Sequence, residues 1–232
     1  MAIQRHTICQ EYWFNHALSL SATPGPGGWC VKDTSSAGTP TYLTGNSDGG
    51  ELVITLANTS EAEIVTLYQN DLLYLPVGAG KLQRVGWLAK VGGVDAVTVV
   101  TLGAASAAVH TGNAEDDVTT SAWFKIEGSA STSAVVLETD DNTTDNNDKS
   151  SGGLALSSTY KWLEIDFELG LSDVRFFADG ARVGGGTKFS MAALASNTRW
   201  QPFVQIEKAS GTGTPSVSIA RFRAIYNVAL GA

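Results

Sequence analysis

The strongest structural signal in the sequence lies in residues 160–186, which read YKWLEIDFELGLSDVRFFADGARVGGG. From residue 160 to residue 167, polar and apolar side chains alternate. Successive side chains of a β-strand point to opposite faces, so this alternation predicts a strand with one buried face. The buried face is expected to carry Leu163, Ile165 and Phe167, and the other face Trp162, Glu164, Asp166 and Glu168.

Two further strands are predicted directly after this one. Residues 169–173 form a short polar turn into a strand at 174–178, and Asp179-Gly180 is a strong hairpin signal before residues 181–183. The whole stretch is therefore expected to be a meander of three antiparallel strands, with Val174, Phe176 and Ala178 on the inner face.

Short strands also fill most of the remaining chain, separated by clusters of glycine, asparagine and aspartate. They are predicted at residues 52–56, 63–68, 72–75, 81–90, 97–102, 122–126, 134–139, 199–208 and 216–227. Such spacing without an internal repeat predicts an all-β sandwich of two antiparallel sheets. A chain of 232 residues is long enough for one such domain. We assign residues 28–232 to this domain and residues 1–27 to an N-terminal arm, which closes on the breaker TPGPGG.

Charge and hydropathy exclude two classes of partner. The formal net charge is −8, with only 15 scattered lysines and arginines, whereas nucleic-acid binding rests on clustered basic residues. The longest apolar stretch, residues 96–109, is too short and too rich in β-branched residues for a membrane helix. The N-terminus lacks the apolar core of a secretory signal, so we expect the protein to be made and kept in the cytoplasm unless it leaves in a larger assembly.

The predicted arm carries three adjacent aromatic residues, Tyr12, Trp13 and Phe14. Neither a strand nor a helix can bury all three on one side, so at least one is expected to meet another surface. The alternative is that they cover the open end of the sandwich. We take Tyr12, Trp13 and Phe14 as candidate partner-binding residues.

Several segments follow one another in an order that resembles the concanavalin A-like jelly roll of the laminin-G-like kind. They are WFKIE at 123–127, VVLETDD at 135–141, YKW at 160–162, VRFFADG at 174–180, QPFVQI at 201–206 and SVSI at 216–219. The resemblance covers about residues 28–230, and the VRFFADG hairpin is its most specific part. More narrowly, the sequence resembles versions of this fold in structural proteins of tailed bacteriophages, including capsid decoration or cement proteins.

This narrower resemblance implies a virion protein without catalytic activity or cofactor. It would be made in the host cytoplasm, bind the major capsid protein on the outer surface of the head, and stabilise the shell by bridging its subunits. A symmetric homotrimer is expected, because it would match the local three-fold positions of an icosahedral shell.

The alternatives are both carbohydrate-related. Glu164, Asp166 and Glu168 also resemble the Glu-x-Asp-x-Glu triplet of retaining β-glucanases, in which the first glutamate would be the nucleophile and the last the acid/base. However, strand residues four apart lie about 13 Å from each other at Cα, whereas retaining hydrolysis needs carboxyl groups about 5–5.5 Å apart. We therefore interpret Glu164 and Glu168 as solvated carboxylates, whose replacement by glutamine would change little.

The other alternative is a lectin-like module for host attachment, in which a strand tryptophan stacks on a pyranose. The candidates are Trp87, Trp123, Trp162 and Trp200, and Trp162 is the best because it shares a face with the acidic triplet.

No metal site is assigned. The acidic loop at residues 138–148, ETDDNTTDNND, has the oxygen atoms that Ca²⁺ prefers, but its spacing matches no EF-hand pattern, and a solvated loop capped by its own side chains is the simpler interpretation. His6, His16 and His110 lie far apart, and Cys9 and Cys30 have no recognised zinc spacing. The two cysteines are expected to be free, buried thiols.

Overall fold

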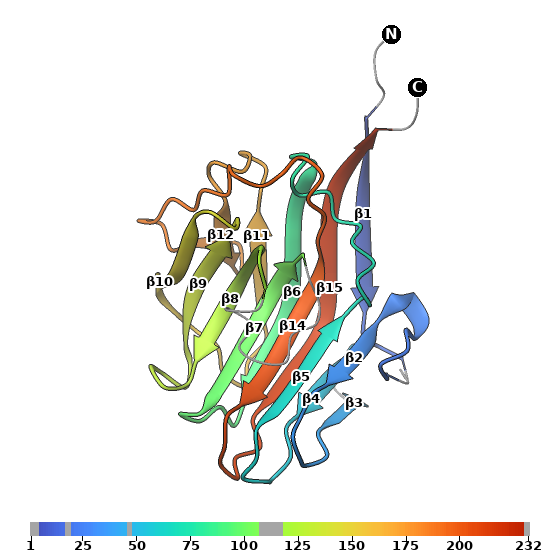
Figure 1. The fold of residues 1–232 in the computed structure, drawn as a ribbon, viewed down its shortest axis with the longest axis vertical. Helices are drawn as coiled ribbons and strands as arrows, with labels where there is room; N and C mark the ends of the chain where they lie inside the picture. The colour runs from blue at the N-terminus through green and yellow to red at the C-terminus, as the bar shows by residue number, and fades with distance from the viewer. Residues whose placement is uncertain (1–4, 17–19, 46–47, 107–117, 230–232) are drawn as a thin grey trace.

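The protein is a sandwich of two antiparallel sheets, as predicted (Figure 1). The computed structural model describes residues 5–16, 20–45, 48–106 and 118–229. The first sheet contains, in spatial order, β13 (Ala181–Val183), β12 (Arg175–Ala178), β11 (Lys161–Asp166), β6 (Leu82–Gly92), β15 (Ser216–Ala229), β4 (Glu51–Thr55) and β3 (Thr41–Gly45), and β1 (Arg5–Trp13) also pairs with β15. The second sheet contains β10 (Asp145–Ala155), β9 (Ala134–Asp140), β8 (Ser121–Glu127), β7 (Thr98–Ala105), β14 (Gln201–Lys208), β5 (Glu63–Tyr68) and β2 (Cys30–Asp33).

The predicted meander is confirmed and lies at one side of the first sheet. β11 pairs with β12 through Leu163 opposite Ala178 and Ile165 opposite Phe176, and β12 continues into β13. All the residues predicted for the inner face are buried: Leu163, Ile165, Phe167, Val174, Phe176 and Ala178.

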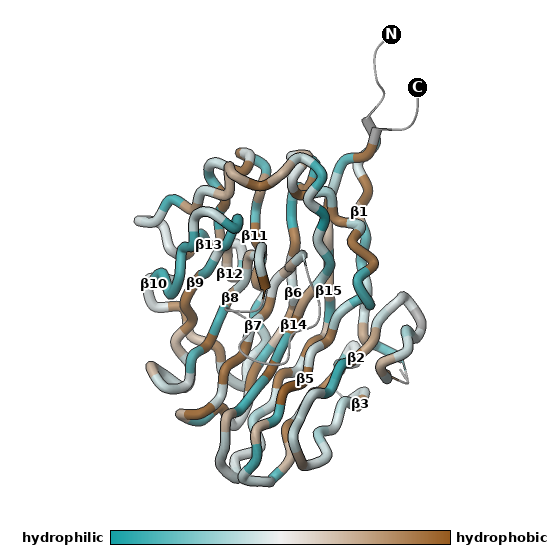
Figure 2. Tube along the Cα trace, viewed as in Figure 1, coloured by the Kyte–Doolittle hydropathy of each residue, from teal (hydrophilic) through white to brown (hydrophobic). Residues whose placement is uncertain are grey.

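The core fills the space between the sheets. Apolar and polar residues alternate along many of the strands, so that each sheet turns one apolar side inward (Figure 2). At one end of this core, Trp29, Trp87 and Phe222 pack ring against ring, with centroids 4.7–5.9 Å apart. Burial of such large side chains is the main stabilising contribution in a sandwich of this size.

The N-terminal segment differs from the predicted arm. Its residues 5–13 form β1, which pairs in continuous register with the second half of β15, while β4 pairs with the first half. Phe14 follows in the same line, donates its backbone N–H to the oxygen of Ala220 at 3.0 Å, and is fully buried. The boundary that we placed after residue 27 therefore does not separate the described part of this segment from the sandwich.

The structure also differs from the predicted elements elsewhere, and β2 and β3 were not predicted. Residues 72–75 are not a strand, and only Leu75 makes an isolated bridge, to Trp200. The acidic stretch 138–148 is not one loop, because its two ends belong to β9 and β10 and only the turn between them is irregular. Among the described residues, no helix is long and apolar enough to cross a membrane.

Candidate functional site on the outer face of the first sheet

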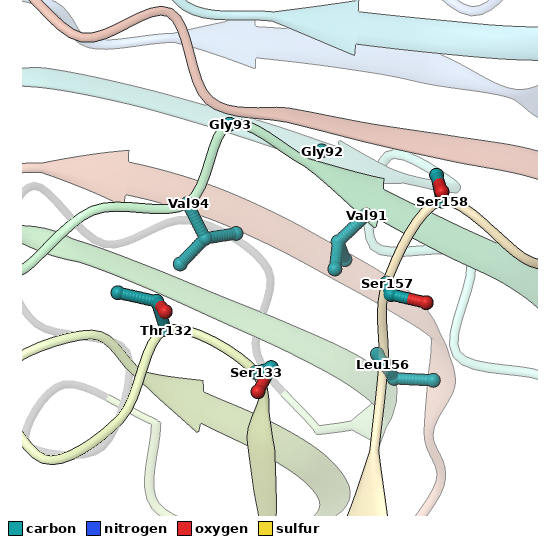
Figure 3. Close-up of a pocket in the computed structure, with 9 residues that line it drawn as sticks. All are labelled: Val91, Gly92, Gly93, Val94, Thr132, Ser133, Leu156, Ser157 and Ser158. Atoms are coloured by element: carbon teal, nitrogen blue, oxygen red, sulfur yellow. The ribbon is translucent and has the colours of Figure 1, made fainter.

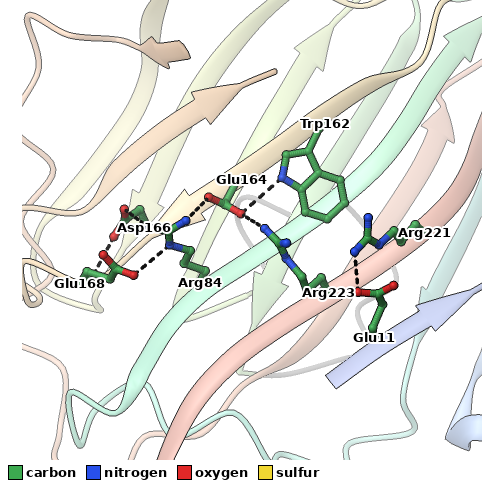
Figure 4. Close-up of polar contacts among 8 residues, drawn as sticks. All are labelled: Glu11, Arg84, Trp162, Glu164, Asp166, Glu168, Arg221 and Arg223. Atoms are coloured by element: carbon green, nitrogen blue, oxygen red, sulfur yellow. Dashed lines mark hydrogen bonds and ion pairs between the residues drawn. The ribbon is translucent and has the colours of Figure 1, made fainter. Parts of the chain in front are cut away.

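The outer face of the first sheet holds a connected group of charged and aromatic side chains from four strands and the turn after β11 (Figure 4). We call this group the outer-face cluster. Strand pairing brings its members together: Asp166 lies opposite Arg84, and Gly86 lies between Glu164 on one side and Arg223 on the other. The cluster consists of Glu11, Arg84, Trp162, Glu164, Asp166, Glu168, Arg221 and Arg223.

Arg84 connects the three carboxylates of the predicted triplet. Its Nη1 lies 3.2 Å from Oε1 of Glu164, its Nε donates to Oε1 of Glu168 at 3.0 Å, and its Nη2 lies 3.9 Å from Oδ2 of Asp166. The hydrogen bond to Glu168, together with the charges of all three acids, raises the pKa of Arg84 above its ordinary value. One guanidinium therefore pairs with all three carboxylates of the triplet.

Glu164 is not the solvated carboxylate that we predicted. Its side chain is 9% exposed, and a second guanidinium, that of Arg223, lies 2.5 Å from Oε2. The indole N–H of Trp162 points to the same oxygen at 3.3 Å. An almost buried carboxylate must be paired, and Arg84, Arg223 and the Trp162 indole are the partners that the sequence pattern did not reveal.

The other two acids have different surroundings. Glu168 has a side chain that is 46% exposed, in accord with the solvated position predicted for it. Asp166 is largely buried, and burial raises its pKa above the ordinary value, although the backbone N–H of Glu168 donates to Oδ1 at 2.7 Å and opposes the shift. The triplet thus combines a paired, a poorly solvated and an exposed carboxyl group.

Trp162 lies against the sheet over Gly86 of the neighbouring strand. A Cβ atom on Gly86 would come within 2.4 Å of the indole ring, so the ring occupies the space that a side chain there would fill. The guanidinium carbons of Arg221 and Arg223 lie 5.2 and 4.8 Å from the ring centroid and flank it (Figure 4). The absence of a side chain at position 86 is what permits this orientation.

Arg221 extends the row to β1. It forms an ion pair with Glu11, and its guanidinium lies 4.7 Å from the ring centroid of Trp13. Trp13 is 40% exposed, whereas Phe14 is buried and Tyr12 packs partly against the core. Of the three predicted partner-binding residues, only Trp13 therefore presents a large aromatic surface to solvent.

A second, smaller group lies on the same face at Glu51. The Tyr160 hydroxyl donates to this carboxylate, and Lys90 Nζ lies 3.0 Å from it and 4.5 Å from the Tyr160 ring centroid. Burial alone would raise the pKa of Glu51, but the hydrogen bonds from Tyr160 and Lys90 outweigh it and hold the pKa below its ordinary value.

The other three candidate tryptophans cannot act as stacking surfaces, which corrects the prediction for them. Trp87, Trp123 and Trp200 are each no more than 1% exposed. The indole N–H of Trp87 donates to the oxygen of Gly103 at 3.0 Å. Trp123 points away from the main core, yet it is buried in a separate cluster with Phe203 on the second sheet.

The described residues contain no group of three or more His, Cys, Asp or Glu side chains with metal-ligand geometry. In the acidic turn, Asp140 and Asp141 accept hydrogen bonds from backbone N–H groups of residues 142–144, which is the self-capping that we predicted. Cys30 is buried and free as expected, but Cys9 is exposed. His6 and His16 are exposed, and His110 lies outside the described residues.

A pocket of about 260 Å³ lies away from the outer-face cluster, between the end of β6, residues 132–133 and residues 156–158 (Figure 3). Its lining consists of serine and threonine hydroxyls, glycines and aliphatic side chains, with no charged group. It offers no acid, base or nucleophile pair of the kind that catalysis requires.

Comparisons with known proteins identify the fold. No protein-family model and no curated protein matches the chain. Among solved structures, the laminarinase from Rhodothermus marinus has a TM-score of 0.62 at 10% identity, covering 98% of this chain and 100% of that chain. The Bacillus licheniformis β-glucanase has a TM-score of 0.56 at 11% identity, covering 93% and 97%.

A binding domain is also similar. The carbohydrate recognition domain of Emp46p in its potassium-bound form has a TM-score of 0.53 at 8% identity, covering 85% of this chain and 88% of that chain. Such low identities establish the architecture and not a shared activity. The chain has the concanavalin A-like jelly-roll fold, which it shares with carbohydrate-active enzymes and with a carbohydrate recognition domain.

Proposed function

We propose that this protein binds carbohydrate on the outer face of its first sheet and does not hydrolyse it. The observation that carries the proposal is the position of Trp162, whose ring lies over Gly86, contacts the guanidinium groups of Arg221 and Arg223, and directs its N–H at Glu164. Sugars are bound by an aromatic face for their C–H groups and by fixed polar groups for their hydroxyls. Trp13, next to Arg221, provides a second aromatic surface in the same row.

The position of Arg84 favours binding over hydrolysis. A retaining hydrolase uses one carboxylate as nucleophile and a second, protonated carboxyl group as acid, with the sugar between them. Here Arg84 forms hydrogen bonds to both Glu164 and Glu168. A guanidinium in this position stabilises negative charge on both groups and occupies the space between them, which suits hydrogen bonding to a ligand better than proton transfer.

The function favoured from the sequence was a capsid decoration protein that binds the major capsid protein as a homotrimer. The similar structures named above are two carbohydrate-active enzymes and a carbohydrate recognition domain. They support the carbohydrate-related alternatives that we weighed, a lectin-like module or, less favoured, a retaining β-glucanase. The capsid role stays a prediction, and a glycan-binding face for host attachment is compatible with it.

The test is affinity electrophoresis of the full chain in gels containing laminarin or mixed-linkage β-glucan, together with a glycan array. We expect retardation, or binding to defined glycans, that is lost in Gly86→Ala because the new methyl group displaces Trp162. Gly92→Ala on the same strand is the matched control, since its Cβ would meet only the Ser216 hydroxyl at 3.1 Å. Trp162→Phe tests the same surface without altering the backbone.

Two outcomes would contradict the proposal. The first is an array and gels in which no glycan binds the folded protein. The second is release of reducing sugar from laminarin or mixed-linkage β-glucan that disappears in Glu164→Gln, which would make the protein a glucanase that depends on Glu164. Thermal unfolding of each variant separates loss of binding from loss of fold.

A further inference from the structure

Strand β1 is an open sheet edge of a kind that soluble proteins usually protect. An edge strand presents unpaired backbone N–H and C=O groups, and proteins block it with short strands, irregular pairing, charges or proline. In the described part of the chain, the other edge strands have such protection: β13, β3 and β2 are short, and β10 pairs with two register shifts. β1 runs for 9 residues in unbroken register without lysine or proline.

The hydrogen-bond pattern shows which backbone groups of β1 are free. Phe14 N–H donates to Ala220 O on β15, whereas Asn227 N–H, opposite Thr7, donates away from β1 to Lys81 O. Along a strand of an antiparallel sheet, the backbone N–H and C=O groups of successive residues point alternately to one side of the strand and to the other. The even-numbered residues of β1 therefore bond to β15, and the backbone groups of Thr7, Cys9 and Glu11 point to the open edge.

The surroundings of this edge leave it accessible. Among the described residues, β15 is the one strand that pairs with β1, and the side chains of Thr7, Cys9, Glu11 and Trp13 are all exposed. In Figure 1, the N-terminal end of β1 and the end of β15 rise beyond the body of the sandwich, and the rest of β1 runs alongside β15.

Charge does not oppose a second copy at this place. The whole chain carries a net charge of −8, which resists association in general. Among the described side chains of β1, however, Glu11 is the one carboxylate, and Arg221 forms an ion pair with it. Tyr74 packs on Tyr226, which lies opposite Ile8 of β1. The two residues before Tyr74, Leu72 and Leu73, are 63% and 38% exposed, so exposed apolar area lies close to β1.

We propose that β1 pairs with β1 of a second copy of this chain in an antiparallel, two-fold arrangement centred on Cys9. In a two-fold pairing, each residue whose backbone groups face the open edge must lie opposite another such residue of the second copy. With Cys9 opposite Cys9 of the second copy, Thr7 faces Glu11, and all 9 residues of β1 are paired. Any other register leaves part of the strand unpaired. The first sheets of the two copies then form one continuous sheet, and their outer faces lie side by side.

The test uses light scattering after size exclusion, over a wide range of protein concentrations. The full chain is expected at twice the monomer mass of 24.3 kDa. Thr7→Pro removes an N–H that faces the edge and leaves the ladder with β15 intact, so it should give a folded monomer. Thr7→Val is the matched control, because it also loses the side-chain bond to Asn227 but keeps the N–H, and it should remain a dimer.

A short bismaleimide reagent tests the register. Opposed residues in a hydrogen-bonded pair lie about 5.5 Å apart at Cα, so Cys9 should crosslink the two copies efficiently. Cys9→Ser should abolish the crosslink, and Cys30→Ser should not, because Cys30 is buried. The proposal would be overturned by a monomeric full chain, by a dimer that survives Thr7→Pro, or by a dimer that Cys9 does not crosslink. A trimer would also overturn it, and would support the homotrimer expected from the sequence.

Discussion

Replacing Glu164 with glutamine is expected to destabilise the protein far more than the same replacement at Glu168. Glutamine keeps the shape of glutamate but loses its charge and one of its two acceptor oxygens. Glu164 is 9% exposed and bonds through different oxygens to Arg84 and Arg223. Glu168 is 46% exposed and bonds to Arg84 alone.

The size of the difference follows from these contacts. A hydrogen bond to a charged group contributes about 1.5–3 kcal/mol. A glutamine in place of Glu164 would keep one of its two bonds to arginine, through the amide oxygen, and would turn its NH₂ group toward the other arginine. The expected loss is about 2–3 kcal/mol, which corresponds to a decrease in Tm of roughly 5–10 °C for a domain of this length. For Glu168→Gln, an exposed ion pair is worth about 0.2–1 kcal/mol.

The measurement is urea unfolding of both variants, followed by tryptophan fluorescence at neutral pH. Equal m-values would show that the same surface is exposed on unfolding in each case, so that the midpoints can be compared. If the two substitutions cost the same, within about 0.5 kcal/mol, the pairing of Glu164 with two guanidinium groups has been overestimated.

Three further predictions concern the same sheet. Phe176→Ala should cost about 3–5 kcal/mol in urea unfolding, because the ring is fully buried against Phe124 and Phe189, while Trp162→Ala should cost clearly less; similar losses would contradict this assignment of faces. Asp166→Asn should leave the free energy of unfolding at pH 7 unchanged or slightly higher, because burial raises the pKa of Asp166 and so penalises its ionised form; a loss above about 1 kcal/mol would contradict this. Glu51 has a lowered pKa in the folded protein, so its stabilising contribution is present above the unfolded pKa and is lost as the pH falls through the folded one; Glu51→Gln should therefore flatten the decrease in stability between about pH 5 and pH 3, and parallel curves would exclude this role.

The fold was predictable where alternation is strong and local. Residues 160–183 alternate cleanly and have turn residues between them, so both the strands and their inner faces follow from the sequence. β1 was not predicted because its sequence lacks the alternation of polar and apolar residues. His6 and Gln10 are polar residues on the face of β1 that is directed to the core, where the pattern would require apolar ones. β10 was missed because an edge strand of Asp, Asn, Lys, Ser and Gly has neither alternation nor β-propensity.

The faces of the strands were easier to predict than the burial of their residues. Alternation places Trp123 on the side away from the main core, and this is where it lies. It does not reveal that Trp123 and Phe203 are both buried there, in one cluster with Ala105 and Val118. The same limit applied to Glu164, whose partners lie 80 and 59 residues away in the sequence.

The outer-face cluster also explains why a Glu-x-Asp-x-Glu triplet does not by itself define a reaction. Period-two spacing places Glu164, Asp166 and Glu168 on one side of the chain, and nothing in that spacing determines their protonation or their distance from one another. Those properties come from the adjacent strands, through Arg84 opposite Asp166 and Arg223 beyond Gly86. An acid/base pair requires one carboxyl group that is held protonated beside one that is ionised. Two guanidinium groups among three carboxylates favour the ionised form of the carboxylates that they contact. The same groups, with the Trp162 ring over Gly86, are the donors, acceptors and aromatic surface on which the proposed sugar binding rests.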